Sequence, residues 1–551
     1  MRKLLLVVVG IILVSSMVFA GGNRQAANTS SDPNYPITLS VFKMDVRPRP
    51  AANHPMYQYL RERLNVTFEW DFLVGDIAQR RGTMIAGGTF PDLLEIRETA
   101  FIEAGAVIPL EGLIEQYAPR IKAFYEQAGV WNKLKSSDGH IYYLPNYGVF
   151  QGLDHTPNYD QAAFWIQKAI LKDAGYPTIR TVDQYFDLIE NYYRRNPTIN
   201  GQPAIPFTIL THDWRAFELW NPPNFLAGYP NDGNGTVNPS TYEYKTFFTQ
   251  DFSKQWFRKL NELDKRGLVD RTGFTDNYDQ YAAKISSGRV LGQSVQGWQF
   301  QQYDNANRDR GENIRTMAPL PIVFSENIRP RYRNITIPNL GRGVSISVSA
   351  RDPVRIIRFF DQFMTEEVQR TMEWGIEGKD WQYNAQRVPY RTQQQRDNWN
   401  NQDWQEQNRA LLVRDFMPKI QGSFTDGYPT DLAQYFPERE AMLLPEDREL
   451  YAAYNVSGTN ELMDKNPPPN ALWFPTWNMD NPPDGSPAQI ALQRTEETMK
   501  RLLPQMILAP TAQFDSLWDA YVREIEVTNN IRVYEQYMQQ MLNERIREWS
   551  R

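Results

Sequence analysis

The sequence predicts an α/β fold built around a mostly parallel sheet. Between residues 37 and 96, three segments alternate apolar and polar residues, and two segments with helical signals separate them. A strand, a helix and a second strand in this order form the βαβ unit from which parallel sheets are built. Hydrophobic residues make up 41% of the 551 residues, so the chain can bury a sizeable core.

The elements of the amino-terminal part follow from periodicity and from helix-ending residues. Alternating side chains predict strands at residues 37–41 and 66–72, with a short third strand at residues 92–96. Helices are expected at residues 55–64 and 76–86, and a pair of glycines ends the second of these.

The middle of the chain continues this alternation. A turn leads into an aromatic strand at residues 141–145, and residues 164–174 are expected to be helical. Thr181 and Gln184 have the spacing of a capping box, which opens a further helix that runs through Tyr193.

The clearest helix spans residues 353–373, where Asp352 is a natural N-cap and a proline occupies the first turn. A strand with one polar face precedes it at residues 344–348. The last third of the chain is rich in Gln, Asn, Arg and Trp and contains a proline-rich loop at residues 466–487 with two tryptophans. The chain ends in three expected helices, at residues 488–503, 514–527 and 531–549.

Composition excludes several classes of protein and site. Lys+Arg 59 against Asp+Glu 65 gives a net charge of −6, which argues against a nucleic-acid partner. The absence of cysteine excludes disulfides, thiol nucleophiles, iron–sulfur clusters and cysteine-based zinc sites. The 4 histidines have no metal-binding spacing, so neither a metal nor another cofactor is expected.

Familiar catalytic motifs are missing from the sequence. It contains no GxSxG nucleophile elbow, no GxxxxGK[ST] phosphate loop and no GxGxxG turn opening a helix. Carboxylates are plentiful, so a pair of acidic residues of the glycosidase kind stays open as an alternative. Residues 232–235 are interpreted as a tight turn, although calcium binding near Asp232 also stays open.

The amino terminus is interpreted as an export signal. A basic pair precedes an apolar stretch that is shorter than a membrane span, and small residues follow it. Residues 1–20 are therefore expected to be a signal peptide cleaved after Ala20, with residues 21–35 as a flexible leader. Because the chain has no cysteine to carry a lipid anchor, a periplasmic location without a tether is expected.

The aromatic residues are the most informative part of the composition. They account for 13% of the chain, with 15 Trp, 29 Tyr and 28 Phe. Sugars stack their C–H faces on flat rings, while planar polar side chains bind their hydroxyl groups. Residues 142–147, 296–299 and 374–382 all combine rings with such polar side chains, which is typical of a sugar-binding cleft.

Several motifs resemble those of a known family. Residues 84–92 (MIAGGTFPD) are similar to the "(I/L)-A-(S/G)-G-x-x-P-D" motif of family 1 extracellular solute-binding proteins, the receptors of ABC importers. Residues 105–119 and 138–145 resemble the two motifs that follow in that family. Residues 344–361 and 374–378 resemble its large, lipoprotein-type branch, which is predicted to serve carbohydrate uptake.

The resemblance implies a type II-like periplasmic-binding-protein fold. In such a fold two α/β lobes, each with a mixed, mostly parallel sheet flanked by helices, are joined by hinge strands and close on a ligand. Carried over to this chain, the first lobe comprises residues 36–150 and 320–380. The second, helix-rich lobe comprises residues 151–319 and 381–551.

The resemblance also implies that the protein binds a ligand and is not an enzyme. The chain would be a monomer that binds an oligosaccharide between its lobes and delivers it to a membrane permease. Asp92 ends the glycine-rich turn of the family motif and is expected either to accept a sugar hydroxyl or to cap local backbone. The expected ligand-binding residues are Asp92, Tyr143, Tyr147, Trp214, Trp298, Arg342, Trp374 and Trp381.

Two alternatives remain open on the sequence alone. A secreted carbohydrate-active enzyme, either a glycoside hydrolase or a lyase, would use a similar aromatic cleft. The same receptor fold could instead bind peptides or another polar solute.

Overall fold

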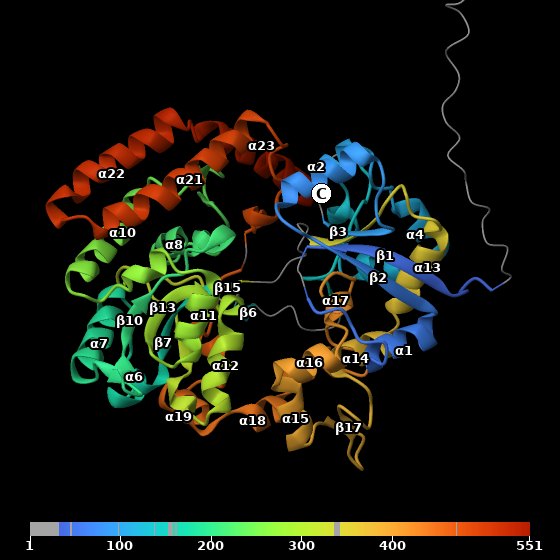
Figure 1. Cartoon of the computed structure of the whole chain (residues 1–551), viewed down its shortest axis with the longest axis horizontal. Coiled ribbons are helices and arrows are strands. Elements are labelled where there is room, and N and C mark those ends of the chain that lie inside the picture. The colour runs from blue at the N-terminus through green and yellow to red at the C-terminus, as the bar shows by residue number, and fades with distance from the viewer. Residues whose placement is uncertain are drawn as a thin grey trace, which may run out of the picture.

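The computed structural model describes residues 32–550, apart from residues 45–46, 97–98, 137, 152–157, 160–161, 335–341 and 470. Within these residues the chain forms two lobes, which Figure 1 shows side by side, with the blue amino-terminal strands in the lobe on the right. The expected signal peptide and most of the expected leader lie outside the described residues. In the described part of the chain, no helix is long and apolar enough to cross a membrane.

The first lobe is built on a five-stranded sheet with the order β2-β1-β3-β16-β4. Its strands are β1 (Ile37–Lys43), β2 (Val66–Phe72), β3 (Leu93–Ile96), β4 (Leu144–Pro145) and β16 (Arg342–Ile346). β1 pairs in parallel with β2 and β3, as the βαβ pattern predicts, whereas β16 pairs antiparallel with β3 and β4. The last strand to enter this sheet therefore comes from a part of the chain that follows most of the second lobe.

Helices cover the first-lobe sheet and share its core. Leu39, Val41, Ile356 and Phe360 are fully buried in one cluster that joins strand and helix side chains. The helix expected at residues 353–373 is divided in two by a break after Phe363. The helices of this lobe are α1 (Pro55–Leu64), α2 (Ile77–Gly87), α3 (Thr99–Glu103), α4 (Glu111–Tyr117), α5 (Pro119–Gln127), α13 (Pro353–Phe363) and α14 (Glu366–Trp374).

The segment that follows α14 packs with the first lobe, which differs from the boundary expected at residue 381. Leu412 and Phe416 are buried in the first-lobe core, and Leu432 shares a small buried cluster with Trp374 and Trp381. The short helices here are α15 (Gln393–Asn400), α16 (Gln402–Asn408) and α17 (Leu411–Arg414). Their polar composition gives no clear apolar period, so the sequence does not indicate which lobe they join.

The second lobe is built on a four-stranded sheet with the order β10-β13-β7-β14. Its strands are β7 (Ala162–Gln167), β10 (Ile205–Thr208), β13 (Val290–Gln296) and β14 (Met317–Leu320). β10 and β13 are parallel, whereas β7 runs antiparallel to both of its neighbours. Both sheets are therefore mixed, as expected, but parallel pairs do not predominate in either.

β7 also corrects one helix expected from the sequence. Residues 162–167 form a strand that is buried along its whole length, and the helix α6 occupies only Lys168–Asp173. A short, continuous apolar run has no period that separates a buried strand from a buried helix, which explains the error. The helix opened by the capping box of Thr181 and Gln184 is confirmed as α7 (Val182–Arg195).

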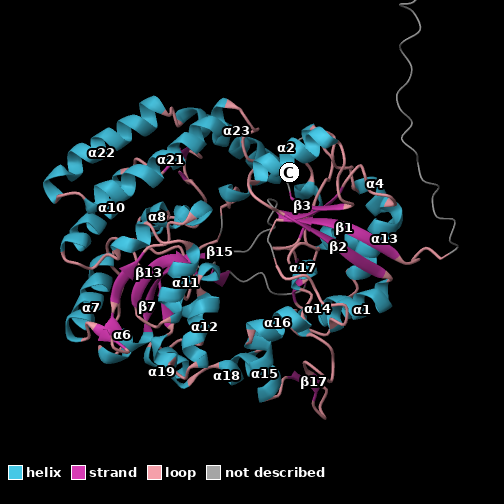
Figure 2. Cartoon of the chain, viewed as in Figure 1, coloured by secondary structure: helices cyan, strands magenta, loops and turns pink. Residues whose placement is uncertain are grey.

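Figure 2 shows one group of strands in each lobe, with helices around it. In the second lobe, three carboxy-terminal helices form a layer that packs on α10 (Asp251–Lys265) (Figure 1). These are α21 (Pro487–Leu508), α22 (Phe514–Arg523) and α23 (Arg532–Trp549). The other helices of this lobe are α8 (Phe217–Trp220), α9 (Pro222–Leu226), α11 (Tyr278–Ser286), α12 (Gln301–Asp309), α19 (Pro445–Ala453) and α20 (Thr459–Met463).

Residues 320–334 lie in the second lobe rather than in the first. Leu320 and Ile322 belong to its main core, and Tyr332 stacks on Phe225 with ring centroids 5.2 Å apart. The pairing of β14 with β7 holds this stretch in place, so the chain returns to the first lobe only at β16. The described residues belong to the first lobe up to β5 (Phe150–Gln151), to the second lobe from β7 to residue 334, and to the first lobe again from β16 to α18 (Phe436–Met442), after which α19 lies in the second lobe.

Two further contacts join the lobes. The Arg81 guanidinium on α2 pairs with the Asp484 carboxylate, which precedes α21. The Lys133 ammonium lies 4.9 Å from the ring centroid of Trp549 at the end of α23. The carboxy-terminal helices therefore reach from the second lobe to the surface of the first.

Candidate functional site

A cavity of about 1370 Å³ is lined by residues of both lobes. Met44 and Leu73 directly follow β1 and β2, and Ile77 opens α2, so the first lobe contributes the carboxyl ends of its parallel strands. In the second lobe, Gln296 ends β13 and Trp214 follows β10, the two parallel strands of that sheet. Open α/β sheets bind ligands at this edge, where loops follow the carboxyl ends of parallel strands.

Stacked rings form one wall of the cavity. Trp214 and Trp298 lie with centroids 5.8 Å apart and an angle of 11° between their planes. Phe217 continues the row, 6.2 Å from Trp214 at 18°. Trp214 is 57% exposed and Trp298 is 49% exposed, although large apolar side chains are usually buried. These rings therefore offer flat apolar surface to whatever occupies the cavity.

An arginine lies within this aromatic wall. The guanidinium carbon of Arg215 lies 4.5 Å from the Trp214 ring centroid and 4.0 Å from that of Tyr278. Its Nη1 donates to Asp213 Oδ2 over 2.6 Å, and its Nε donates to Gln299 Oε1 over 3.2 Å. The charge of Arg215 is therefore paired, and its planar group lies between two rings.

Planar polar side chains and a second aromatic segment complete the lining. The indole nitrogen of Trp298 donates to Gln296 Oε1 over 3.3 Å, and Asn221 lines the cavity beside them. Trp477 lies on the loop before α21 and is also partly exposed to the cavity. The remaining lining includes Asn231, Asn234, Phe247, Asp480, Asn481, Glu496, Lys500 and Tyr534.

Burial shifts the pKa of acidic groups around the cavity. Burial raises the pKa of Glu218 to about 8, although the backbone N–H of Gln296 donates to its carboxylate and partly opposes the shift. Burial also raises the pKa of Glu496, while the nearby Lys500 ammonium opposes that shift. Burial raises the pKa of Tyr278 to about 12. Glu218 is thus largely uncharged at neutral pH.

The structure brings together three of the residues expected from the sequence. Tyr147, Trp214 and Trp298 all line the cavity, and Tyr147 is 44% exposed. Tyr147 comes from the segment between β4 and β5 (Phe150–Gln151), whereas both tryptophans come from the second lobe. Their role in ligand binding stays a prediction, since placement alone does not measure binding.

Three other expected rings are core residues. Trp374 is 0% exposed, and its indole nitrogen donates to the carbonyl oxygens of Pro429 and Thr430. Trp381 is 3% exposed and packs edge-on against Trp374. Tyr143 is buried in an apolar cluster that also contains Phe42 of β1 and Leu94 of β3. None of these rings lines the cavity, and all three are almost completely buried.

Asp92 takes the backbone-capping role rather than that of a cavity group. Its Oδ2 accepts hydrogen bonds from the amide and hydroxyl of Ser40, over 2.9 and 2.7 Å, and its Oδ1 accepts from the amide of Arg351. It is 4% exposed and does not line the cavity. Arg342 lies in β16, but its side chain is outside the described part of the structure.

Sequence reasoning missed several lining residues. Arg215 and Tyr278 stand in no motif, and only folding brings them together from segments that follow different strands. For Trp477 the sequence did contain a signal, because a proline-rich loop with two tryptophans is an unusual surface segment. Gln296 and Gln299 belong to the segment whose mixed composition is typical of a sugar cleft.

Calcium binding at Asp232 is not supported by its surroundings. Its Oδ1 accepts the backbone N–H of Thr476, and the Thr476 hydroxyl donates to its carbonyl oxygen. Burial raises the pKa of Asp232 to about 7. Among the described residues, no group of three or more His, Asp or Glu could hold a metal ion.

Comparison with known proteins gives one curated relative, and no family model matches the sequence. The relative is the fructooligosaccharide ABC transporter substrate-binding protein FusA of Streptococcus pneumoniae serotype 4, which is 25% identical over 292 residues. These residues make up 47% of this chain and 51% of that protein. The chain thus matches about half the length of its curated relative.

Solved structures match over nearly the whole chain. The alginate-binding protein AlgQ2 has a TM-score of 0.65 at 17% identity, covering 93% of this chain and 98% of that one. FusA of S. pneumoniae in complex with kestose has a TM-score of 0.60 at 16% identity, covering 92% and 99%. A solute-binding protein from Bifidobacterium longum infantis, described as HMO binding and associated with an ABC transporter, has a TM-score of 0.60 at 18% identity, covering 92% and 99%. The two-lobed solute-binding fold is therefore confirmed.

Proposed function

We propose that this chain is the substrate-binding receptor of an ABC importer and that it binds an oligosaccharide in the cavity between its lobes. The observation that carries the proposal is the parallel pair of half-exposed indoles, Trp214 and Trp298, beside the planar amides of Gln296 and Gln299. Rings of this kind bind the C–H faces of sugars, and amides bind their hydroxyl groups.

The size and the charge of the cavity support an oligosaccharide. Its 1370 Å³ exceeds the range of about 300–1,000 Å³ that is usual for a drug-sized ligand. The charged side chains in its lining are Arg215, Asp480, Glu496 and Lys500, two of each sign. A balanced lining suits a neutral polyol better than a strongly charged solute. The printed names of FusA and AlgQ2, proteins that bind fructooligosaccharide and alginate, support a saccharide ligand as such.

The proposed mechanism is lobe closure without bond chemistry. A ligand that contacts both lobes stabilises the closed state by its differential affinity for that state. The proposed partner is a membrane permease that recognises the surface of the closed form. The proposed state of the protein is a monomer in the periplasm. No catalytic role is assigned to any residue.

Titration calorimetry of residues 21–551 with a panel of oligosaccharides tests this function. Kestose, maltotriose and an alginate trisaccharide cover neutral and acidic sugars. Heat that saturates near one ligand per protein is expected for at least one of them. Steady power after each injection would mean turnover and favour the enzyme. Binding of tripeptides with no binding of any sugar would favour a peptide receptor.

The variant in which Trp214 and Trp298 are both alanine is the matched control. It should lose the saturating heat while its unfolding transition stays close to that of the parent protein. If the double variant binds as tightly as the parent, the cavity is not the binding site.

A further inference from the structure

The backbone that carries Trp214 is unusual. Asp213, directly before it, has a φ of 51°, in the left-handed region that residues other than glycine seldom adopt. Asp213 Oδ1 accepts the backbone N–H of Arg215 over 3.0 Å, which stabilises the turn. The turn directs a largely exposed indole toward the cavity, where its neighbouring rings are Phe217 and Trp298.

Arg215 adds a further contact to this ring and links it to a third aromatic residue. Its guanidinium lies over the Trp214 ring on one side and over the Tyr278 ring on the other. Asp213 Oδ2 accepts a hydrogen bond from Nη1, and Gln299 Oε1 accepts one from Nε. These two bonds restrict the orientation of the guanidinium. Only 19% of the Arg215 side chain is exposed, so few of its rotamers remain available.

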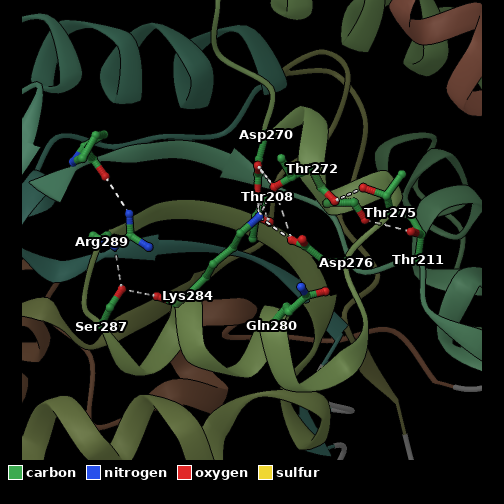
Figure 3. A network of polar contacts seen from close by, with 12 residues as sticks. Thr208, Thr211, Asp270, Thr272, Thr275, Asp276, Gln280, Lys284, Ser287 and Arg289 are labelled. Atoms are coloured by element: carbon green, nitrogen blue, oxygen red, sulfur yellow. Dashed lines mark hydrogen bonds and ion pairs between the residues drawn. The ribbon is translucent and has the colours of Figure 1, made fainter.

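A polar network lies between the segment before Trp214 and the segment before Tyr278, and Figure 3 shows it from close by. The Lys284 ammonium bonds Asp270 Oδ2 over 2.5 Å and the Thr272 hydroxyl over 2.6 Å, and it also pairs with Asp276. The Thr211 hydroxyl donates over 2.8 Å to the carbonyl oxygen of Gly273.

That network joins the two segments that carry the rings. Thr211 stands three residues before Trp214, and Asp276 stands two residues before Tyr278. A Cβ at position 273 would lie 2.8 Å from the carbonyl oxygen of Ile209, so only glycine allows the two segments to approach this closely. These contacts set how closely the two segments approach, and Arg215 contacts the rings that both segments carry.

We infer that Arg215 is a positioning residue that holds Trp214 parallel to Trp298, so that the aromatic wall is preformed before a ligand arrives. The role in sugar binding rests on the proposed function, whereas the effect on ring geometry does not. A preformed wall loses less side-chain entropy on binding, which favours tighter binding.

The far-ultraviolet circular dichroism of the Trp214–Trp298 pair measures its geometry without any ligand. Two indoles at this separation couple their transitions, and a twist between the transition dipoles within the two nearly parallel planes gives a couplet. The difference spectrum of the parent protein and Trp214→Phe isolates it. Arg215→Met should remove the same couplet. Arg215→Lys keeps the charge beside Asp213 but lacks the planar group, and it should restore only part of the couplet.

Arg195→Met is the matched control. Arg195 also pairs with an aspartate, Asp173, and bonds Asn191, and neither partner lines the cavity. This variant should keep the full couplet. Arg215→Met should also weaken the binding of the sugar found by calorimetry by about 2- to 30-fold, the range that corresponds to loss of a cation–π contact.

The outcomes separate this inference from the proposed function. A couplet that persists in folded Arg215→Met would overturn the positioning role, whatever the protein binds. A crystal structure of the ligand-free parent protein in which the two ring planes lie far from the 11° seen here would contradict the stacked pair itself. If Arg215→Met loses the couplet but the parent binds no sugar of the panel, the positioning role stands and the proposed function fails.

Discussion

Trp298 and Trp374 show how differently one residue type is used in this chain. Trp298 presents half of its surface to the cavity, whereas Trp374 is completely buried and donates to two backbone carbonyls. The first ring has free area for a ligand. The second has none, so its substitution should affect stability alone.

Trp298→Ala should weaken sugar binding by about 1–3 kcal/mol, the usual loss for a central aromatic anchor. Its free energy of unfolding should change little, because much of the ring is exposed in the free protein. Trp374→Ala should lower the free energy of unfolding by about 3–5 kcal/mol and leave the Kd unchanged. Calorimetry measures the Kd, and urea denaturation measures the free energy of unfolding. Weaker binding by Trp374→Ala together with lower stability of Trp298→Ala would contradict the assignment of both rings.

Glu218 makes stability depend on pH. Because burial raises its pKa in the folded state to about 8, the folded protein retains a proton that the unfolded chain loses near its ordinary value of 4.5. The stability associated with the protonated group is therefore fully present below pH 4.5 and is lost as the pH rises toward 8.

Glu218→Gln should remove this dependence. Between pH 5 and pH 8 the parent protein should lose stability relative to the variant, by at most about 1.4 kcal/mol per pH unit. Urea denaturation of both proteins at several pH values gives the difference, in which the titration of other groups such as Asp232 cancels. Equal slopes for the two proteins would show that the carboxyl titrates normally.

At the scale of elements, Asp92 ties three segments of the first lobe together. Its carboxylate accepts from Ser40 in β1 and from Arg351 after β16, and Asp92 itself directly precedes β3. A hydrogen-bonded carboxylate in this place fixes the order in which the strands lie side by side. The family motif at residues 84–92 thus ends in a structural residue in this chain.

Asp92→Asn should lower the free energy of unfolding by about 1–3 kcal/mol, because one amide oxygen cannot replace both carboxylate oxygens as acceptors. The Kd for sugar should stay close to that of the parent, since Asp92 does not line the cavity. Denaturation and calorimetry on the same samples check both statements. A large loss of affinity with unchanged stability would return Asp92 to the binding site.

Elements with a strong local signal could be predicted, and those defined by distant partners could not. The capping box of Thr181 and the alternation in β2 are local, and both elements formed as expected. The sequence predicts helix at β7 because its continuous apolar run has no clear period, and its strand conformation depends on pairing with β13 and β14. Likewise, Trp214 and Trp374 are indistinguishable in sequence, since only folding decides which ring is covered.

At the scale of the whole molecule, the Arg81–Asp484 pair connects the lobes away from the chain crossings. Arg81 is buried on α2, whereas Asp484 is exposed on the loop before α21. A contact of this kind favours the arrangement in which the lobes approach each other. It should therefore bias the equilibrium between open and closed forms even without a ligand.

Arg81→Ala should enlarge the ligand-free molecule in small-angle X-ray scattering and weaken sugar binding. Exchanging the two charges, with Asp at position 81 and Arg at 484, should restore part of both effects, with a coupling of about 0.5–1 kcal/mol. Arg63→Ala is the control, because Arg63 pairs with Glu367 inside the first lobe. Scattering that is the same for Arg81→Ala and the parent would show that the pair does not hold the lobes.

The late entry of β16 into the first-lobe sheet has a consequence for folding. β3 ends at Ile96 and β16 begins at Arg342, and strand pairing between parts of a chain so far apart in sequence is slow. Until it forms, β3 lacks one neighbour, and the unpaired strand edge can pair with other chains. The first lobe must therefore wait, incomplete, for the rest of the polypeptide, and a chain that terminates before β16 cannot complete it.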